Sequence, residues 1–220
     1  MTQSKLKMLH QSNQSKAMLL DKIAQKRTFP KATDSSSNTA ISFFKAIEID
    51  PVLCFKNELE AVNGKVFICS DSEDLYQQIS DFLEPYRDQN IYCQYKDVAF
   101  ELKKRSGLIT CNDIITDSVQ IGIVKSICNV ARTGSVVVSA HSGRQANIFP
   151  PIQLIIARKA DLVNFMEDAF DFLSQQYAQQ IPSTITFITG PSRTADIEKT
   201  LVMGAHGPKE LYVFITNNDI

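Results

Sequence analysis

The sequence predicts an α/β fold, in which a layered, mostly parallel or mixed sheet is flanked by helices. Short runs of β-branched and aromatic residues alternate along the chain with segments whose apolar residues recur at helical spacing. The predicted strands are apolar on both faces, which is typical of parallel strands covered by helices on each side. The composition, 44% hydrophobic and 21% charged over 220 residues, is that of a globular protein with a full core.

The helices are predicted from apolar residues three and four positions apart and from capping residues at their ends. They cover residues 55–64, 70–84, 95–105 and 161–180. Gly64 is expected to close the first helix in the left-handed conformation, as glycine commonly does. The helix at 161–180 has the clearest pattern, with Leu162, Phe165, Ala169 and Leu173 on one face.

The strands are predicted from short β-branched runs bounded by turn residues. They cover residues 65–69, 90–93, 119–124, 135–140, 152–158, 184–189 and 210–216. Because no helix is predicted between the strands of 119–158, this part is expected to form an antiparallel excursion or a mixed region of the sheet. By pattern alone, residues 131–158 form a long hairpin.

The chain is expected to divide into a basic N-terminal helical segment with a linker, residues 1–40, and a single α/β domain, residues 41–220. Residues 1–31 carry seven basic side chains against Asp21 alone, a local net charge of +6, so the remainder carries −7 to reach the total of −1. A charged, solvated helix is favoured over an organelle transit peptide. Residues 26–40, rich in Ser, Thr and Lys, form the best linker.

The composition excludes several classes of protein. A net charge of −1 gives no reason to expect a nucleic-acid partner, and no apolar run approaches the ~18 residues of a membrane span. The five cysteines form no CxxC pair, and the three histidines are scattered, so no metal site and no iron–sulfur cluster is expected in this chain. The cysteines are expected to be buried, reduced thiols of a cytoplasmic protein.

The stretch ITGPSRTADIEKTLVMGAHGPKELYVFI, residues 188–215, contains the strongest candidate site. It is expected to form a strand, a glycine turn and a helix that begins at Thr194. The unpaired N–H groups of such a helix start, with Arg193 beside them, would make an anion site at a sheet edge. The alternative is that Thr194 only caps the helix and that Arg193 pairs with Asp196 or a distant carboxylate.

Two further sets of residues are weaker candidates. His206 lies between glycines, where it would act as an acid or base, or else hold the turn through the backbone. Ser135 and His141 with a carboxylate would form a nucleophile system, but the GxSxG turn that presents such a serine is missing.

Two stretches of the chain, residues 131–158 and 188–215, resemble the LUD domain, the lactate-utilisation family. The resemblance rests on Thr133-Gly134-Ser135, on PPIQLIIAR at 150–158 and on nearly the whole of the second stretch, and it covers roughly residues 50–216. It implies a fold similar to that of the ribose-phosphate isomerase, glucosamine-phosphate deaminase and CoA-transferase group, whose members bind phosphorylated or acidic ligands at such loops.

The resemblance implies an accessory component of bacterial lactate oxidation to pyruvate, which acts with iron–sulfur partner proteins and has no cofactor in this chain. A small anionic ligand is expected to bind at residues from the two stretches. These are Gly134, Gly190, Ser192, Arg193, Thr194, His206 and Gly207, with His206 and Asp196 as the candidates for acid/base chemistry.

Alternatives remain open at this point. One is an independent enzyme of isomerase or acyl-transfer type, and another is a module that senses a small acidic or phosphorylated metabolite. Assembly into a homo-oligomer is also left open. The family commonly has a glutamate before Thr-Gly, whereas Arg132 stands there in this chain, which weakens the case for an independent enzyme.

Overall fold

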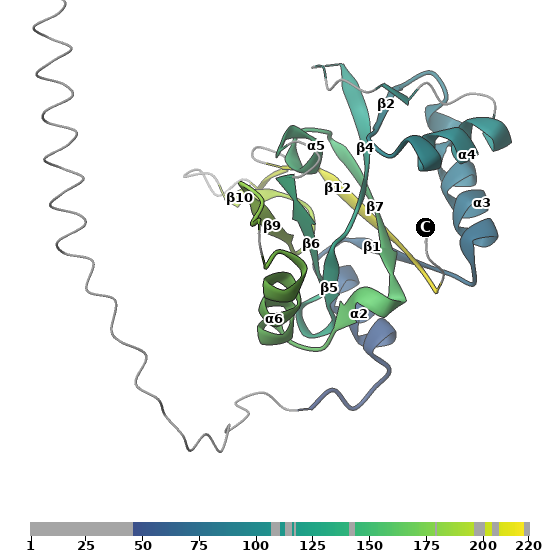
Figure 1. The fold of residues 1–220 in the computed structure, drawn as a ribbon. Helices are drawn as coiled ribbons and strands as arrows, with labels where there is room; N and C mark the ends of the chain where they lie inside the picture. Colours follow the sequence, from purple (N-terminus) through teal and green to yellow (C-terminus); the bar gives the residue numbers. More distant parts are fainter. Residues whose placement is uncertain are drawn as a thin grey trace, which may run out of the picture. The chain divides into compact units, whose positions relative to one another are not determined.

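A six-stranded sheet of parallel strands forms the centre of the fold (Figure 1). The computed structural model describes residues 46–106, 111–112, 116, 118–140, 144–178, 180–195, 201–203 and 207–217. The strands of the sheet are β1 Lys65–Cys69, β12 Glu210–Thr216, β7 Ile152–Arg158, β4 Val119–Lys125, β2 Asn90–Cys93 and β3 Cys111–Asn112, in that spatial order. The predicted α/β class is therefore confirmed.

Two helices cover one face of this sheet (Figure 1). They are α3, Ser72–Leu83, and α4, Lys96–Ser106, and a short 3-10 turn, Glu84–Tyr86, follows the first of them. The Asp71 side chain accepts from the Asp74 N–H and so caps α3 at its N-terminus, as its sequence predicts. Leu75, Ile79 and Leu102 are fully buried against the strands.

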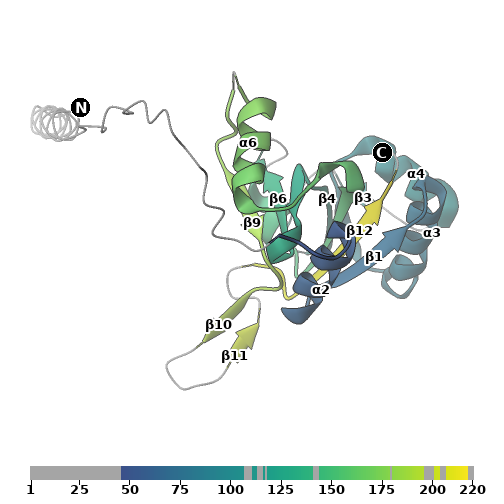
Figure 2. The ribbon, with the colours of Figure 1, turned by 90° about the horizontal axis from the view of Figure 1, so that it is seen from below.

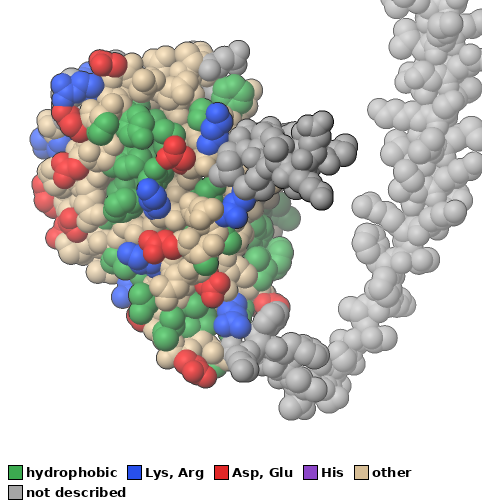
Figure 3. All heavy atoms as spheres, turned by 180° about the vertical axis from the view of Figure 1, so that it is seen from behind, with side chains coloured by type: hydrophobic (Ala, Val, Ile, Leu, Met, Phe, Trp, Pro, Cys, Tyr) green, Lys and Arg blue, Asp and Glu red, His purple; other side chains and the backbone are tan. Residues whose placement is uncertain are grey.

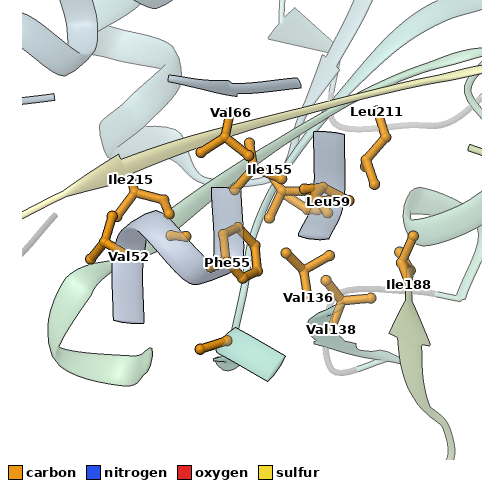
Figure 4. Close-up of a cluster of buried hydrophobic side chains, with 14 of the residues drawn as sticks. Val52, Phe55, Leu59, Val66, Val136, Val138, Ile155, Ile188, Leu211 and Ile215 are labelled. Atoms are coloured by element: carbon orange, nitrogen blue, oxygen red, sulfur yellow. The ribbon is translucent and has the colours of Figure 1, made fainter. Parts of the chain in front are cut away.

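Helix α2, Pro51–Ala61, and a second, mixed sheet cover the other face. This sheet has four strands in the order β8 Leu162–Val163, β5 Cys128–Val130, β6 Ser135–Ser139 and β9 Ile185–Ile188. Figure 4 shows the core between these layers, where Phe55 and Leu59 of α2 meet Val136 and Val138 of β6. An antiparallel region within 119–158 is thus confirmed in the pairing of β5 with β6.

The mixed sheet has a helix of its own on its outer face. This helix, α6, spans Met166–Gln176 and buries Ala169 and Leu173 against Cys128, Val130 and Val137. The prediction placed its start at 161, which was wrong, because Leu162 and Val163 pair with β5 as strand β8. The Asp168 side chain accepts from the Phe165 N–H and fixes the true start of the helix.

Two other local predictions were wrong. Asn63, not Gly64, takes the left-handed conformation after α2, with φ of 70°. The N–H groups of Asn63 and Gly64 donate to Glu60 O and Leu59 O, which is the Schellman arrangement.

The long hairpin expected over 131–158 does not form. Strand β6 belongs to the mixed sheet and β7 to the parallel sheet, and α5, Arg144–Ile148, lies between them.

The described residues all fall within one compact unit, Ala46–Ile220. Residues 1–45, which include the predicted N-terminal segment and linker, lie outside the description. No helix in the described part of the chain is long and apolar enough to cross a bilayer. On the face shown in Figure 3, acidic and basic side chains are interspersed.

Candidate functional site

The helix predicted to begin at Thr194 does not form in the part of 191–203 that is described. Residues Arg193–Ala195 and Leu201–Met203 are strands β10 and β11, paired antiparallel, and they extend away from the sheets (Figure 2). The anion site predicted from a helix N-terminus therefore has no helix to supply its N–H groups. Asp196 and His206 lie outside the described residues, and Thr194 is described only through its strand.

Three described members of the predicted site, Gly134, Gly190 and Arg193, lie against the C-terminal end of α2. Arg193 is exposed, and its guanidinium donates to the carbonyl of Val62, just past the last turn of that helix. Gly190 has φ of 97°, and a Cβ built there would lie 2.9 Å from a methyl carbon of Val62. A cation at a helix C-terminus is favourable, so Arg193 has a structural role here.

Gly134 packs even more closely on the same helix. It has φ of 60°, and a Cβ built there would lie 2.4 Å from the backbone nitrogen of Leu59. Ser192 and Gly207 also meet, since the Ser192 N–H donates to Pro208 O at 2.8 Å and a Cβ on Gly207 would lie 3.2 Å from that of Ser192. We call Gly134, Gly190, Ser192, Arg193 and Gly207 the hairpin-base cluster.

Three hydroxyl groups join the two sequence stretches behind this cluster. Ser135 Oγ lies 2.7 Å from Thr133 Oγ1 and 2.6 Å from Thr189 Oγ1. Ser135 is fully buried, so this chain of hydroxyls ties β6 to β9 inside the fold. Ser135 is therefore not accessible to a substrate as a nucleophile. Thr189 was not among the predicted site residues, and its hydroxyl helps to hold β6 and β9 together.

A second region, at the carboxyl edge of the parallel sheet, has the form of a ligand site. After β2 the chain passes through α4 to β3, which lies beside β2 at the edge of the sheet. After β4 the chain passes through the mixed sheet and returns to the parallel sheet as β7, on the opposite side of β4 from β2. Neighbouring strands with connections in opposite directions leave a crevice at their carboxyl ends, where α/β proteins commonly bind ligands. Tyr95 follows β2, Lys125 ends β4 and Arg158 ends β7, so all three lie at this edge.

Two adjoining hollows, of about 290 and 330 Å³, open there. We call them together the carboxyl-edge cleft. Their common wall consists of Lys125, Ser126, Ile127, Gln176 and Tyr177. The first hollow adds Ile156, Arg158, Asp161 and Phe172, and the second adds Tyr95, Val124, Ser139 and Asn147. Each hollow is of the size that binds a small metabolite.

The charges of the cleft are paired. Lys125 Nζ lies 3.0 Å from Asp97 Oδ2 and 4.8 Å from the centre of the Tyr95 ring. Burial tends to raise the pKa of the Asp97 carboxyl, but the hydrogen bond and charge of Lys125 outweigh it and lower that pKa. Arg158 forms a two-pronged pair with the nearly buried Asp161, at 2.6 and 2.8 Å.

The buried cysteines Cys128 and Cys69 are not suited to act as nucleophiles. Cys128 lies in β5, close behind the wall, where burial and the charge of Asp161 raise the pKa of its thiol to about 12. The thiol of Cys69, at the end of β1, is raised to about 12 by burial and by Asp74 and Asp71. Both groups are therefore protonated at neutral pH and are poor nucleophiles. Cys54 and Cys93 are buried too, as predicted.

None of the residues that line the cleft was among the site residues predicted from the sequence. A signal was present, because Lys125 and Arg158 are the first charged residues after two apolar strands. If those strands are taken as parallel neighbours, their charged ends meet at one edge of the sheet. No group of three or more potential metal-binding side chains occurs among the residues that the structure describes.

The fold and the cleft together define an α/β protein with an open cleft at the carboxyl edge of its parallel sheet. The LUD domain matches residues 54–216, and the chain therefore belongs to the LUD domain family. A crystal structure of a DUF162 family protein from Deinococcus radiodurans has the same fold, with a TM-score of 0.58 at 12% sequence identity. It covers 76% of this chain, which in turn covers 96% of that chain.

Relatives from several bacteria carry the name Lactate utilization protein C. The protein from Bacillus velezensis is 38% identical over 106 residues, which are 46% of this chain and 44% of that protein. The one from Bacillus subtilis is 37% identical over the same shares, and that from Geobacillus thermodenitrificans is 36% identical. The chain thus spans less than half the length of these relatives.

Proposed function

We propose that this protein is an accessory component of bacterial lactate oxidation to pyruvate, working in the cytoplasm with iron–sulfur partner proteins. The observation that carries the proposal is the similarity, at 36–38% identity, to proteins named Lactate utilization protein C, within a chain of the LUD domain family. Those names give the relatives a part in lactate utilisation, and we propose for this chain the accessory role, the oxidation to pyruvate and the iron–sulfur partners.

The dependence on partners follows from the chemistry of the reaction. Removing two electrons from a 2-hydroxy acid requires a flavin, a nicotinamide or a metal centre. The sequence contains a binding pattern for none of these groups, and thiols as basic as those of Cys69 and Cys128 are poor sources of thiolate ligands. In the proposal the redox centres therefore belong to the partners, and this chain binds a small anion.

Two regions are candidates for the anion. The hairpin-base cluster, with Thr194 and His206, is the one predicted from the sequence. The carboxyl-edge cleft is the one favoured by geometry, because it is hollow, whereas Gly134 and Gly190 are packed against α2. A ligand site at such an edge also agrees with the proposed kinship to the ribose-phosphate isomerase, glucosamine-phosphate deaminase and CoA-transferase group, which remains an analogy of fold.

The proposal is tested in the organism that encodes the protein. Deleting the gene should abolish growth on lactate and leave growth on pyruvate unchanged, because only the step between the two is lost. Oxygen-free purification of the tagged chain from lactate-grown cells should recover iron–sulfur subunits in a stable ratio, with glucose-grown cells as the control. Normal growth of the deletion strain on lactate would overturn the proposal.

The cleft also favours a second candidate, an independent enzyme or a metabolite sensor. Such a protein would bind its ligand and purify without iron–sulfur subunits. If the purified chain alone converts a small acidic substrate to a product, the enzyme is established; if deletion instead changes transcription in response to that compound, the sensor is. Both results differ from the selective loss of growth on lactate.

A further inference from the structure

We infer that the carboxyl-edge cleft binds a small hydroxylated monocarboxylate. The inference deepens the proposed anion-binding role and rests on it. It assigns the ligand to Lys125 and Arg158, at the ends of β4 and β7, and to the neighbouring hydroxyl groups of the cleft, rather than to the hairpin-base cluster.

The charge of the lining favours a single negative charge on the ligand. Lys125 and Arg158 contribute two positive charges to the lining and Asp161 one negative charge, and Asp97 pairs with Lys125 from outside the lining. A ligand that displaces Asp97 from Lys125 therefore meets a local charge of +1. Asp161 is fixed in place by its two bonds to Arg158 and is nearly buried, so it would repel a second negative charge strongly. A monocarboxylate matches this balance better than a phosphate dianion.

Lys125 is the side chain best placed to take the carboxylate. It is about one-fifth exposed, whereas its partner Asp97 is 61% exposed. Exposed ion pairs contribute little stability, so exchanging Asp97 for a ligand carboxylate costs little. An ammonium group also has three N–H donors, which allows it to hold a carboxylate without a fixed geometry.

The hydroxyl groups of the cleft provide recognition of a ligand hydroxyl. Tyr177 OH donates to Ser139 Oγ at 3.4 Å, which is long for a bond between hydroxyls and is readily exchanged for a ligand. The buried Asn147 holds this region by donating to Ser139 O at 2.9 Å. The Ser126 hydroxyl is enclosed and has no hydrogen-bond partner among the described residues, which marks unfilled bonding capacity in the wall.

The remaining wall is apolar and close. Ile127, Ile156 and Phe172 line the first hollow beside the charged groups. They suit a short aliphatic part and exclude a long polar one, because a polar group there would lose its hydrogen bonds to water. A carboxylate, a hydroxyl and a short carbon chain together define a small hydroxy acid.

The test measures binding of lactate to the purified full chain by titration calorimetry at neutral pH, with propionate and inorganic phosphate for comparison. Lactate should bind more tightly than both. Lys125→Met should weaken lactate binding on the order of 10–100-fold, the loss expected for a hydrogen bond to a charged group. Lys104→Met, at an exposed position on α4 outside the cleft, should leave it unchanged. Equal binding by the Lys125 and Lys104 variants would overturn the inference.

Two further variants separate recognition from damage to the fold. Tyr177→Phe should weaken lactate about fivefold or more and leave propionate unchanged, because only the hydroxyl contact is lost. Asp97→Asn removes the competitor for Lys125 and should tighten lactate binding, a gain that misfolding cannot produce. Equal losses for lactate and propionate, or weaker binding by Asp97→Asn, would count against the assignment.

This test stands apart from that of the proposed function. If iron–sulfur subunits co-purify and growth on lactate needs the gene, but lactate does not bind the cleft, the inference fails and the proposed function stands. If lactate binds as expected and the deletion strain still grows on lactate, the cleft is a hydroxy-acid site and the role in lactate oxidation fails.

Discussion

The hairpin-base cluster and the carboxyl-edge cleft differ in how sequence relates to function. Three of the five residues of the cluster are glycines, and the cluster lies in the stretches that resemble the family most closely, yet Gly134 and Gly190 are packed against the end of α2. The cleft has no recognisable sequence motif, yet it is hollow and lined with charged and hydroxyl groups. A distinctive sequence can thus indicate a close approach of two backbone segments as readily as a ligand-binding site.

The largest effect that would sharpen this contrast concerns Gly134. Gly134→Ala should destabilise the protein by about 3 kcal/mol, because the left-handed backbone and the contact with Leu59 both oppose a Cβ. Gly207→Ala is the matched control, since its nearest neighbour is the Ser192 Cβ at 3.2 Å. Urea unfolding measures both, and a loss at Gly134 no greater than at Gly207 would remove the packing role.

On the side of the cleft, Asp161→Asn should cost about 1 kcal/mol of stability. The pair with Arg158 is lost, but the guanidinium is 41% exposed and keeps much of its hydration, which limits the effect. The cleft also becomes more positive, so lactate should bind more tightly. Urea unfolding and calorimetry measure the two effects, and weaker lactate binding would contradict the charge balance assigned to the cleft.

Arg193→Ala compares the two regions directly. It should lower the free energy of unfolding by no more than about 1 kcal/mol, through loss of an exposed cation at the end of α2. Lactate binding should stay unchanged if the cleft is the site. A loss of binding in Arg193→Ala with normal binding in Lys125→Met would reverse the comparison and place the anion at the hairpin-base cluster.

The smallest effect concerns pH. The hydrogen bond and charge of Lys125 hold the pKa of the Asp97 carboxyl below its ordinary value in the folded protein. Its contribution to stability is therefore fully present above the unfolded pKa and is lost as pH falls through the folded pKa. Because Asp97 is 61% exposed, the loss should be at most about 0.5 kcal/mol. Unfolding of the protein and of Asp97→Asn between pH 5 and pH 3, on the order of those pKa values, should show a slightly flatter profile for the variant.

Much of the fold could be predicted because strand and helix periods are local. The strands 65–69 and 90–93 match the structure residue for residue, and the helix start at Asp71 follows from its side-chain chemistry. The β10–β11 pairing was missed because a polar segment with Thr and Ala suits a helix as well as a strand. The pairing of residues 193–195 with residues 201–203 makes the segment a strand, and this pairing cannot be predicted from the local sequence pattern.

The cleft could not be predicted because it depends on the order of the strands. Lys125 and Arg158 are 33 positions apart, and they meet only because β4 and β7 are parallel neighbours. Nothing local shows that the chain leaves the parallel sheet at Ser126 and that β7 returns to it. The hairpin predicted over 131–158 failed for the same reason.

The chain passes between its two sheets at the cleft itself. It leaves β4 for β5 through Ser126 and Ile127, and it leaves β7 for β8 through Lys159–Asp161. Only short segments join the sheets here, with the Ser126 N–H donating to Ile156 O and the Ile127 N–H to Val137 O. A bound ligand would restrict motion of these connecting segments and slow hydrogen exchange of the backbone amides in β5 and β8. Because α6 packs on β5, binding in the cleft would also change the mobility of that helix.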